Sequence, residues 1–140
     1  MEFKFTDHSA EVAAAFEEAL QSGLEKCGLV AEGYAKKLAP VDTGFLRNSI
    51  THALSGEPAK IDKYEANRAK ENKPLQTGKY TGRAPEDSTP AVYIGTNVDY
   101  ATHVEMGTRR SPAQPFLHPA VANHADQYRQ ILEAELKKSR

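Results

Sequence analysis

Metal binding and nucleophilic catalysis are the first chemistries to consider, because the chain holds five histidines and one cysteine. The histidines do not fall at metal-ligand spacings on one helix face: His8, His52, His103, His118 and His124. His103 and Glu105 lie two residues apart, which directs them to different sides of a helix. Ser49 and Ser111 lack the surroundings of a nucleophile elbow, and no glycine-rich phosphate loop is present. The sequence therefore predicts no metal site, no cofactor and no catalytic nucleophile.

The tripeptide Asp42-Thr43-Gly44 suggests a different chemistry, in which two carboxylates share a proton and activate water. Aspartic proteases carry such a tripeptide, and a 140-residue chain would need a homodimer to supply both aspartates. Val92-Tyr93-Ile94-Gly95 even offers the apolar strand ending in glycine that these enzymes require. The protease tripeptide, however, follows a strand of an all-β fold, whereas here it follows a helical pattern and Pro40. We therefore interpret Asp42 as a capping residue and keep the homodimeric protease as the alternative.

The element before this tripeptide is a long predicted helix, about residues 8–38. Its apolar side chains recur at spacings of three and four: Val12, Phe16, Leu20, Leu24, Cys27, Ala31, Tyr34 and Leu38. A helix of about 30 residues is roughly 45 Å long, more than the core of one small domain can cover. Gly23, Gly28 and Gly33 either weaken this helix or permit close packing against a neighbouring subunit. Cys27 lies on the apolar stripe, so we expect a buried and inert thiol.

A tight turn is predicted to follow the long helix. Pro40 ends the helix, because proline disfavours helical geometry in the residue before it. Asp42 or Thr43 is expected to cap a short turn, and Gly44 allows the chain to reverse. A strand is expected next, over residues 48–54.

Residues 55–90 differ in character from the rest of the chain. They hold four prolines, and residues 60–83 alone carry seven basic against three acidic side chains. Residues 61–73 are predicted as a short polar helix and the remainder as loop, forming an arm that projects between two sheet strands. Three interpretations of the arm remain open: a flexible solvated loop, a docking element for another protein, or a DNA contact. DNA is the least favoured, because aromatic stacking partners are nearly absent.

The second half of the chain predicts one strand and one short helix. Residues 91–95 are rich in β-forming side chains, follow Pro90 and end at Gly95, which indicates a strand. Residues 100–106 read as a helix capped by Asn97 or Asp99. Gly107 then stands where a left-handed C-cap residue belongs.

An extended segment and a final helix complete the prediction. Two prolines keep residues 111–117 extended, and Pro119 suits the first turn of a helix over residues 118–137. That helix has an apolar stripe: Val121, Ala125, Tyr128, Leu132 and Leu136. Helices outside a small, mostly antiparallel sheet predict an α+β fold in a single domain, residues 1–140.

Bulk composition restricts the function further. The net charge of −1 gives no overall attraction to nucleic acid. A single cysteine excludes an internal disulfide and fits a protein that folds in a reducing cytoplasm. No run of about 18 apolar residues is present, so no membrane span is expected, and the N-terminal residues lack the layout of a signal peptide.

Three phrases in fixed order carry a family resemblance. They are residues 39–50 (APVDTGFLRNSI), residues 100–108 (YATHVEMGT) and residues 115–120 (PFLHPA). In this order they resemble the head–tail joining and tail-completion family of long-tailed bacteriophages, which includes the minor tail protein Z type. Members of that family carry the first phrase after a long helix and the other two before the last helix.

This resemblance implies a non-enzymatic structural protein of a phage or prophage particle, present in the virion and, during assembly, in the host cytoplasm. Copies of the chain are expected to form a head-to-tail ring in the neck that joins the tail to the head connector. The implied partners are other copies, connector-associated proteins and tail proteins. A host-derived interaction module without a virion role remains a further alternative.

Two sets of residues are expected to matter in such an assembly. Pro40, Asp42, Thr43, Gly44 and Gly107 form the structural turns. A contact between subunits is expected to use side chains of both apolar and basic type: Phe16, Leu20, Arg47, Arg109 and Arg110. Arg47 is expected to form an ion pair within or between subunits.

Overall fold

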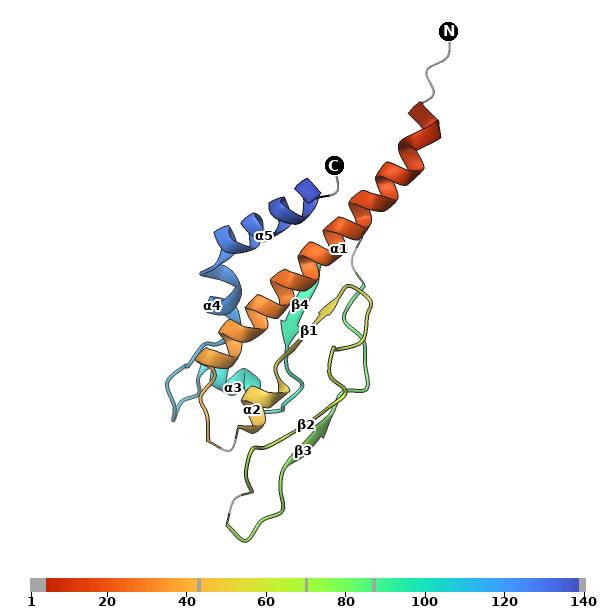
Figure 1. Ribbon diagram of the computed structural model, residues 1–140. Coiled ribbons are helices and arrows are strands. Elements are labelled where there is room, and N and C mark those ends of the chain that lie inside the picture. The colour runs from red at the N-terminus through yellow and green to blue at the C-terminus, as the bar shows by residue number, and fades with distance from the viewer. Residues whose placement is uncertain (1–4, 43, 70, 87, 139–140) are drawn as a thin grey trace.

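In the computed structural model, residues 5–42, 44–69, 71–86 and 88–138 are described, with side chains from residue 14 onward. The elements follow in the order α1 (Phe5–Leu38), α2 (Phe45–Ser49), β1 (Thr51–Leu54), β2 (Lys63–Glu65), β3 (Thr77–Lys79), β4 (Val92–Gly95), α3 (Ala101–Met106), α4 (Leu117–Ala122) and α5 (Ala125–Lys138). Figure 1 shows α1 running diagonally across the upper part of the molecule, with α4 and α5 on one side and the strands on the other. The predicted α+β class is confirmed.

The strands form two small antiparallel sheets. In one, β1 pairs with β4 over the register from Thr51↔Gly95 to Leu54↔Val92. In the other, β2 and β3 form a hairpin in which Tyr64 lies opposite Gly78. A two-stranded sheet is marginal alone, so the β1–β4 pair depends on α1, which packs against both strands.

The core lies beside the C-terminal half of α1, where the buried side chains are small. Ala35 and Ala39, which the predicted stripe did not include, are buried there, and their size lets α4 approach closely. The predicted stripe is wrong at Leu38, which is 46% exposed. The cluster joins every helix except α5 to the hairpin: Ala35, Ala39, Leu46, Ile50, Tyr64, Val98, Ala101, Phe116 and Ala120. The N-terminal turns of α1 extend past this core (Figure 1).

Two of the three helix glycines mark close packing within the chain. A Cβ atom at Gly23 would lie 2.9 Å from Cδ2 of Leu132 on α5, and one at Gly28 would lie 2.8 Å from Cδ2 of His52 on β1. Both distances are too short for a real Cβ contact, so these glycines let α5 and the sheet approach α1. Gly33 has no such neighbour within 4 Å. The close packing that we considered against another subunit is therefore made inside the molecule at Gly23 and Gly28.

The turn after α1 differs in detail from the prediction. Helix α2 begins after Gly44, which occupies the N-cap position with φ of 83°. Asp42 therefore precedes the cap instead of occupying it, and Thr43 lies outside the described residues. Asn48 and Ser49 belong to α2, so the following strand starts at Thr51.

The arm is a hairpin rather than a polar helix, and the prediction for residues 61–73 was wrong. Side chains of β2 alternate exposed, buried, exposed, and the central Tyr64 enters the core. Its ring lies 5.2 Å from that of Phe45 and 5.3 Å from that of Tyr80. The hairpin projects beyond α2 at the lower end of Figure 1, but its base is anchored by these aromatic contacts.

The predicted final helix is two helices, α4 and α5, separated at Asn123 and His124. The ring of His124 stacks on that of Tyr34 with centroids 3.6 Å apart, and the Tyr34 hydroxyl donates a hydrogen bond to Gln127. This contact with α1 stabilises the break between α4 and α5. The predicted stripe assumed one continuous helix and is wrong at Val121 and Ala125, which are exposed.

Helix α3 matches the predicted position, with two local differences. Its N-cap residue is Tyr100 instead of Asn97 or Asp99. Gly107 is the C-cap as predicted, with a positive φ of 79°, but its ψ of 170° is extended and not left-handed helical. None of the described helices is long and apolar enough to cross a membrane.

Candidate assembly surfaces

The three sequence phrases meet in one packed junction beneath the end of α1. The first phrase contributes Leu46 and Ile50, the second Ala101, and the third Phe116 and Ala120, and all five side chains are buried in the same cluster. Ser49 adds a polar contact, because its hydroxyl donates to the Leu46 carbonyl at 2.6 Å. The phrases therefore build the scaffold that positions α2, α3 and α4.

Glu105 ties the second phrase to the third. Its carboxylate accepts hydrogen bonds from the backbone N–H groups of Phe116 at 2.7 Å, Leu117 at 3.1 Å and His118 at 2.8 Å. Burial raises the pKa of Glu105, but these three hydrogen bonds outweigh burial and hold it below its ordinary value. The N-cap residue of α4, Phe116, makes no side-chain cap, so Glu105 supplies that function from α3. The sequence reasoning missed this role, because the carboxylate and the amides are too far apart in the chain for a capping pattern.

Both predicted turn glycines occupy positions that exclude a side chain. A Cβ atom at Gly44 would lie 2.4 Å from Nδ2 of Asn67, and one at Gly107 would lie 2.7 Å from the backbone nitrogen of Ala113. Each glycine also has a positive φ. Pro40 is half-buried beside this turn.

The protease alternative finds no support in the position of Asp42. This residue is exposed in the turn between α1 and α2, and its carbonyl accepts a weak hydrogen bond from Arg68 at 3.4 Å. A protease dyad needs its aspartate after a β-strand and facing a second carboxylate. The element before Asp42 is a 34-residue helix and not a strand.

A buried histidine links α1, β1 and the arm, and the sequence alone did not single it out. His52 Nε2 lies 2.8 Å from Glu25 Oε1, and Nδ1 lies 3.6 Å from Glu32 Oε1, within ion-pair but beyond hydrogen-bond distance. Lys60 adds an ion pair of 3.0 Å to the other oxygen of Glu25. The Glu32 carboxylate is the main cause that raises the pKa of His52; burial opposes it and Glu25 reinforces it. The arrangement is a charged clamp, and no metal-binding group of three or more ligands occurs among the residues that the structure describes.

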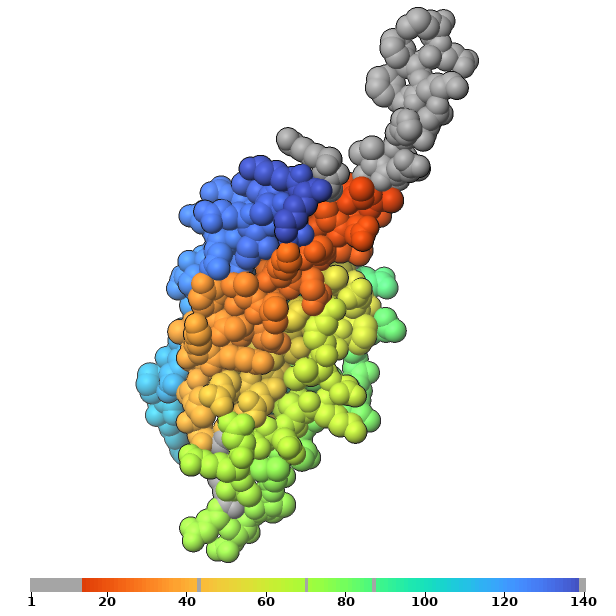
Figure 2. Space-filling view, viewed as in Figure 1, coloured from red at the N-terminus to blue at the C-terminus, as the bar shows by residue number. Residues whose placement is uncertain are grey.

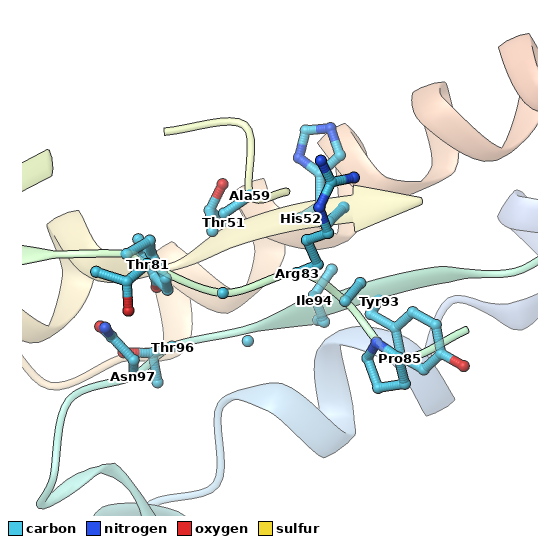
Figure 3. Close-up of a pocket in the computed structure, with 15 residues that line it drawn as sticks. Thr51, His52, Ala59, Thr81, Arg83, Pro85, Tyr93, Ile94, Thr96 and Asn97 are labelled. Atoms are coloured by element: carbon cyan, nitrogen blue, oxygen red, sulfur yellow. The ribbon is translucent and has the colours of Figure 1, made fainter. Parts of the chain in front are cut away.

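A cavity of about 340 Å³ lies between the β1–β4 sheet and arm residues 80–85. Figure 3 shows Arg83 and Pro85 of the arm in front of the sheet, with Thr96 and Asn97 at the other end of the cavity. Among the described residues that line it there is no carboxylate and no cysteine. Its polar lining consists of threonine and tyrosine hydroxyl groups, the Asn97 amide, the His52 ring and Arg83.

The predicted interface residues fall into two separate surfaces. Phe16 is 50% exposed and Leu20 half-buried on the N-terminal part of α1, beyond the reach of the core. Figure 2 shows this part of α1 in orange-red, next to the end of α5 in blue. Val12 lies outside the described side chains.

The predicted arginines lie at the opposite end of α1. Arg47 is half-buried on α2, and Arg109 and Arg110 are exposed in the loop after α3. None of the three forms an ion pair with a described residue, so the ion pair expected for Arg47 is absent within this part of the chain. Met106, the last residue of α3, is 76% exposed.

Comparison with known proteins gives one match. A family model described as "Bacteriophage HK97-gp10, putative tail-component" matches residues 3–107, more than half of the chain. No curated protein and no solved structure matches the chain. The matched part contains α1, both sheets and α3, and it ends at Gly107.

Proposed function

Because this chain belongs to the HK97-gp10-like family of bacteriophage tail components, we propose that it is a structural subunit of the neck, where the tail meets the head connector. On this proposal, identical copies join head to tail in a ring that closes by rotation. Other virion proteins dock on the two faces of the ring. The protein acts by assembly and catalyses no reaction.

One observation carries the proposal: α1 is longer than the core that it supports. Its C-terminal half packs against α2, α4, α5 and the β1–β4 sheet, whereas Phe16 nearer its other end is half-exposed. Exposed apolar side chains that adjoin one another mark interaction surfaces, and Phe16 lies one helical turn from the half-buried Leu20 on the same face of α1. At the far end of the same helix, Arg47, Arg109 and Arg110 form no ion pair with a described residue and supply a second, different surface, which a head-to-tail contact requires.

The hairpin arm suits docking of another neck protein. Its base is fixed by Tyr64 and Tyr80, whereas residues 71–77 at its tip are exposed. A fixed base with a projecting tip presents backbone and side chains to a partner at a defined place. The favoured partner is therefore a connector or tail protein, and DNA remains the less favoured one.

The test of the ring is a double substitution, Phe16→Asp with Leu20→Asp. Light scattering reports the mass of the particles, and circular dichroism reports whether the chain is folded. The expected result is a folded monomer under conditions in which the wild-type chain associates. Val121→Asp on α4 is the matched control, because Val121 is 49% exposed and away from α1's projecting end. A variant that unfolds, or that associates like the wild type, would contradict the assigned interface.

A further inference from the structure

Strand β4 has one free edge. It pairs with β1 on one side, and no strand of the described part of the chain pairs with its other side (Figure 1). The Ser55 N–H donates to the Ala91 carbonyl, which sets the alternation of the ladder. The N–H and C=O groups of Val92 and Ile94 therefore point away from β1, and no described residue forms a hydrogen bond with them. The sheet is open for one more strand at this edge.

Helix α1 meets the sheet at Gly28. A Cβ atom there would lie 2.7 Å from Cγ2 of Val92 on β4 and 2.8 Å from Cδ2 of His52 on β1. Glu25 and Glu32 also contact β1, through the ring of His52. At about 100° per residue, both glutamates lie about 40–60° to one side of Gly28 around the helix axis. This side of α1 therefore covers β1.

The other side of α1 carries leucines where a third strand would lie. By the same angle per residue, Leu24 and Leu20 lie about 40–80° from Gly28 in the direction away from β1. Gly23, which adjoins Leu132 of α5, lies still farther round the helix. Both leucines project between β4 and α5, and both are only half-buried. A strand added at the edge of β4 would complete their burial.

The N-terminal segment, residues 1–4, has the chemistry of such a strand. These residues lie outside the described ones, but their sequence alternates the apolar Met1 and Phe3 with the polar Glu2 and Lys4. A period of two puts both apolar side chains on one face of a strand. The segment also equals β4 in length, since β4 has 4 residues.

The segment cannot reach this edge within its own copy. At about 1.5 Å per residue, Gly28 lies about 35 Å along α1 from the first helical residue, Phe5. A fully extended segment of this length spans at most about 14 Å. Pairing with β4 therefore requires a second copy, and the N-terminal part of α1 extends past the core toward such a neighbour (Figure 1).

We propose that residues 1–4 of one copy add to the free edge of β4 in the next copy as a third strand. Phe3 then packs beneath Leu20 and Leu24 of the receiving copy, whereas Glu2 and Lys4 face away from its α1. The backbone of the segment satisfies the outward groups of β4, and its apolar side chains set the register. This contact rests on the proposed ring, and it joins two different surfaces, as head-to-tail repetition requires.

Two serine substitutions test the alternation. Phe3→Ser removes an apolar side chain that faces α1, and it is expected to weaken association at least about tenfold, because full burial of a phenylalanine contributes at least that factor. Lys4→Ser is the matched control, since its side chain faces away from α1, and it is expected to leave association unchanged. Sedimentation velocity over a concentration series measures the association, and circular dichroism verifies folding.

Hydrogen exchange reports the backbone pairing itself. The amides of residues 91–96 are expected to exchange more slowly in concentrated than in dilute wild-type protein, because the outward N–H groups of Val92 and Ile94 gain acceptors. The Phe3→Ser variant is expected to lack this protection at the same concentration. Residues 101–106, which form α3, are the internal control and are expected to exchange alike at both concentrations.

The outcomes separate this contact from the ring itself. Association that Phe3→Ser leaves intact, that Lys4→Ser weakens equally, or that brings no protection to residues 91–96 overturns the added strand and leaves the ring in place. A wild-type chain that remains monomeric at the highest attainable concentration contradicts both.

Discussion

At the scale of single residues, the three sequence phrases contain residues that satisfy backbone amides or that allow tight turns. Glu105 satisfies three amides at the start of α4. Gly44 and Gly107 occupy positions where a Cβ atom would collide with neighbouring atoms. These residues shape the junction, so their substitution is expected to change stability before it changes assembly.

Glu105→Ala is expected to destabilise the fold by about 1–3 kcal/mol, because it leaves three amide groups without their acceptor. Glu105→Gln keeps one acceptor oxygen and is expected to cost less. Urea unfolding monitored by circular dichroism measures both. Glu133→Ala, on the exposed face of α5, is the control. Equal stability of Glu105→Ala and this control would show that the cap is unimportant.

Gly44→Ala is expected to destabilise the fold by about 1–3 kcal/mol, since the residue has a positive φ and a Cβ atom would displace the Asn67 side chain. Gly33→Ala is the contrasting control, because nothing lies within 4 Å of its Cβ position. In a helix interior that change is expected to stabilise by up to about 1 kcal/mol. Thermal melts of the two variants should therefore move in opposite directions, and a shared direction would contradict this account of Gly44.

The His52 clamp predicts a defined pH dependence. The pKa of His52 is raised above 6.5, so its contribution to stability is fully present below 6.5 and is lost as the pH rises through the raised value. Burial raises the pKa values of Glu25 and Glu32. Hydrogen bonds and charges of His52, Lys60 and Lys36 outweigh burial, so both pKa values lie below the ordinary value. The contribution of these two glutamates to stability is fully present above pH 4.5 and is lost as the pH falls through their lowered pKa values.

The free-energy deficit of His52→Gln relative to wild type is therefore expected to be largest between pH 4.5 and 6.5 and to shrink in alkaline solution. Urea unfolding at a series of pH values measures it. His103→Gln, at an exposed position on α3, is the control. A deficit that grows with pH would mean that His52 is neutral in the folded protein.

At the scale of elements, prediction from sequence succeeded where a pattern was long and local. The apolar stripe of α1 spans many turns, and the β-rich residues of β4 lie between a proline and a glycine. It failed where a distant contact decides the outcome. Tyr64 makes β2 a strand by entering the core, and the stacking of Tyr34 on His124 separates α4 from α5.

The same difference between local patterns and distant contacts explains which residues of the candidate surfaces could be predicted from the sequence. Exposure of Phe16 was expected, because α1 is too long for the core. The His52 clamp gave no local signal, since Glu25, His52 and Lys60 are far apart in the chain. The separation of Phe16 from Arg109 onto opposite ends also required the fold.

Limited trypsin digestion is expected to cut the hairpin arm first at its tip. Arg68 is exposed there, whereas the base is held by Tyr64 and Tyr80. Mass spectrometry of the early fragments identifies the sites, and the two parts of the chain are expected to stay associated. First cuts within α1 at Lys26 or Lys36 would contradict a stable long helix.

At the scale of the whole molecule, the fold is a rod-like helix with a packed junction at one end and a projecting tip at the other (Figure 1). A shape with two different ends suits subunits that contact one another head to tail. The hairpin projects from the same region as the junction, away from the N-terminal part of α1 (Figure 1). The combination matches a subunit that is completed by its neighbours in a particle.

The central claim is that this tail component is located in the neck, and imaging of labelled particles tests it most directly. A tag at the C-terminal end of the chain, after α5, can be marked with gold and viewed by electron microscopy of intact virions. The account predicts a cluster of label confined to the junction of head and tail. Label distributed along the tail, or found at its far tip, would contradict a neck ring.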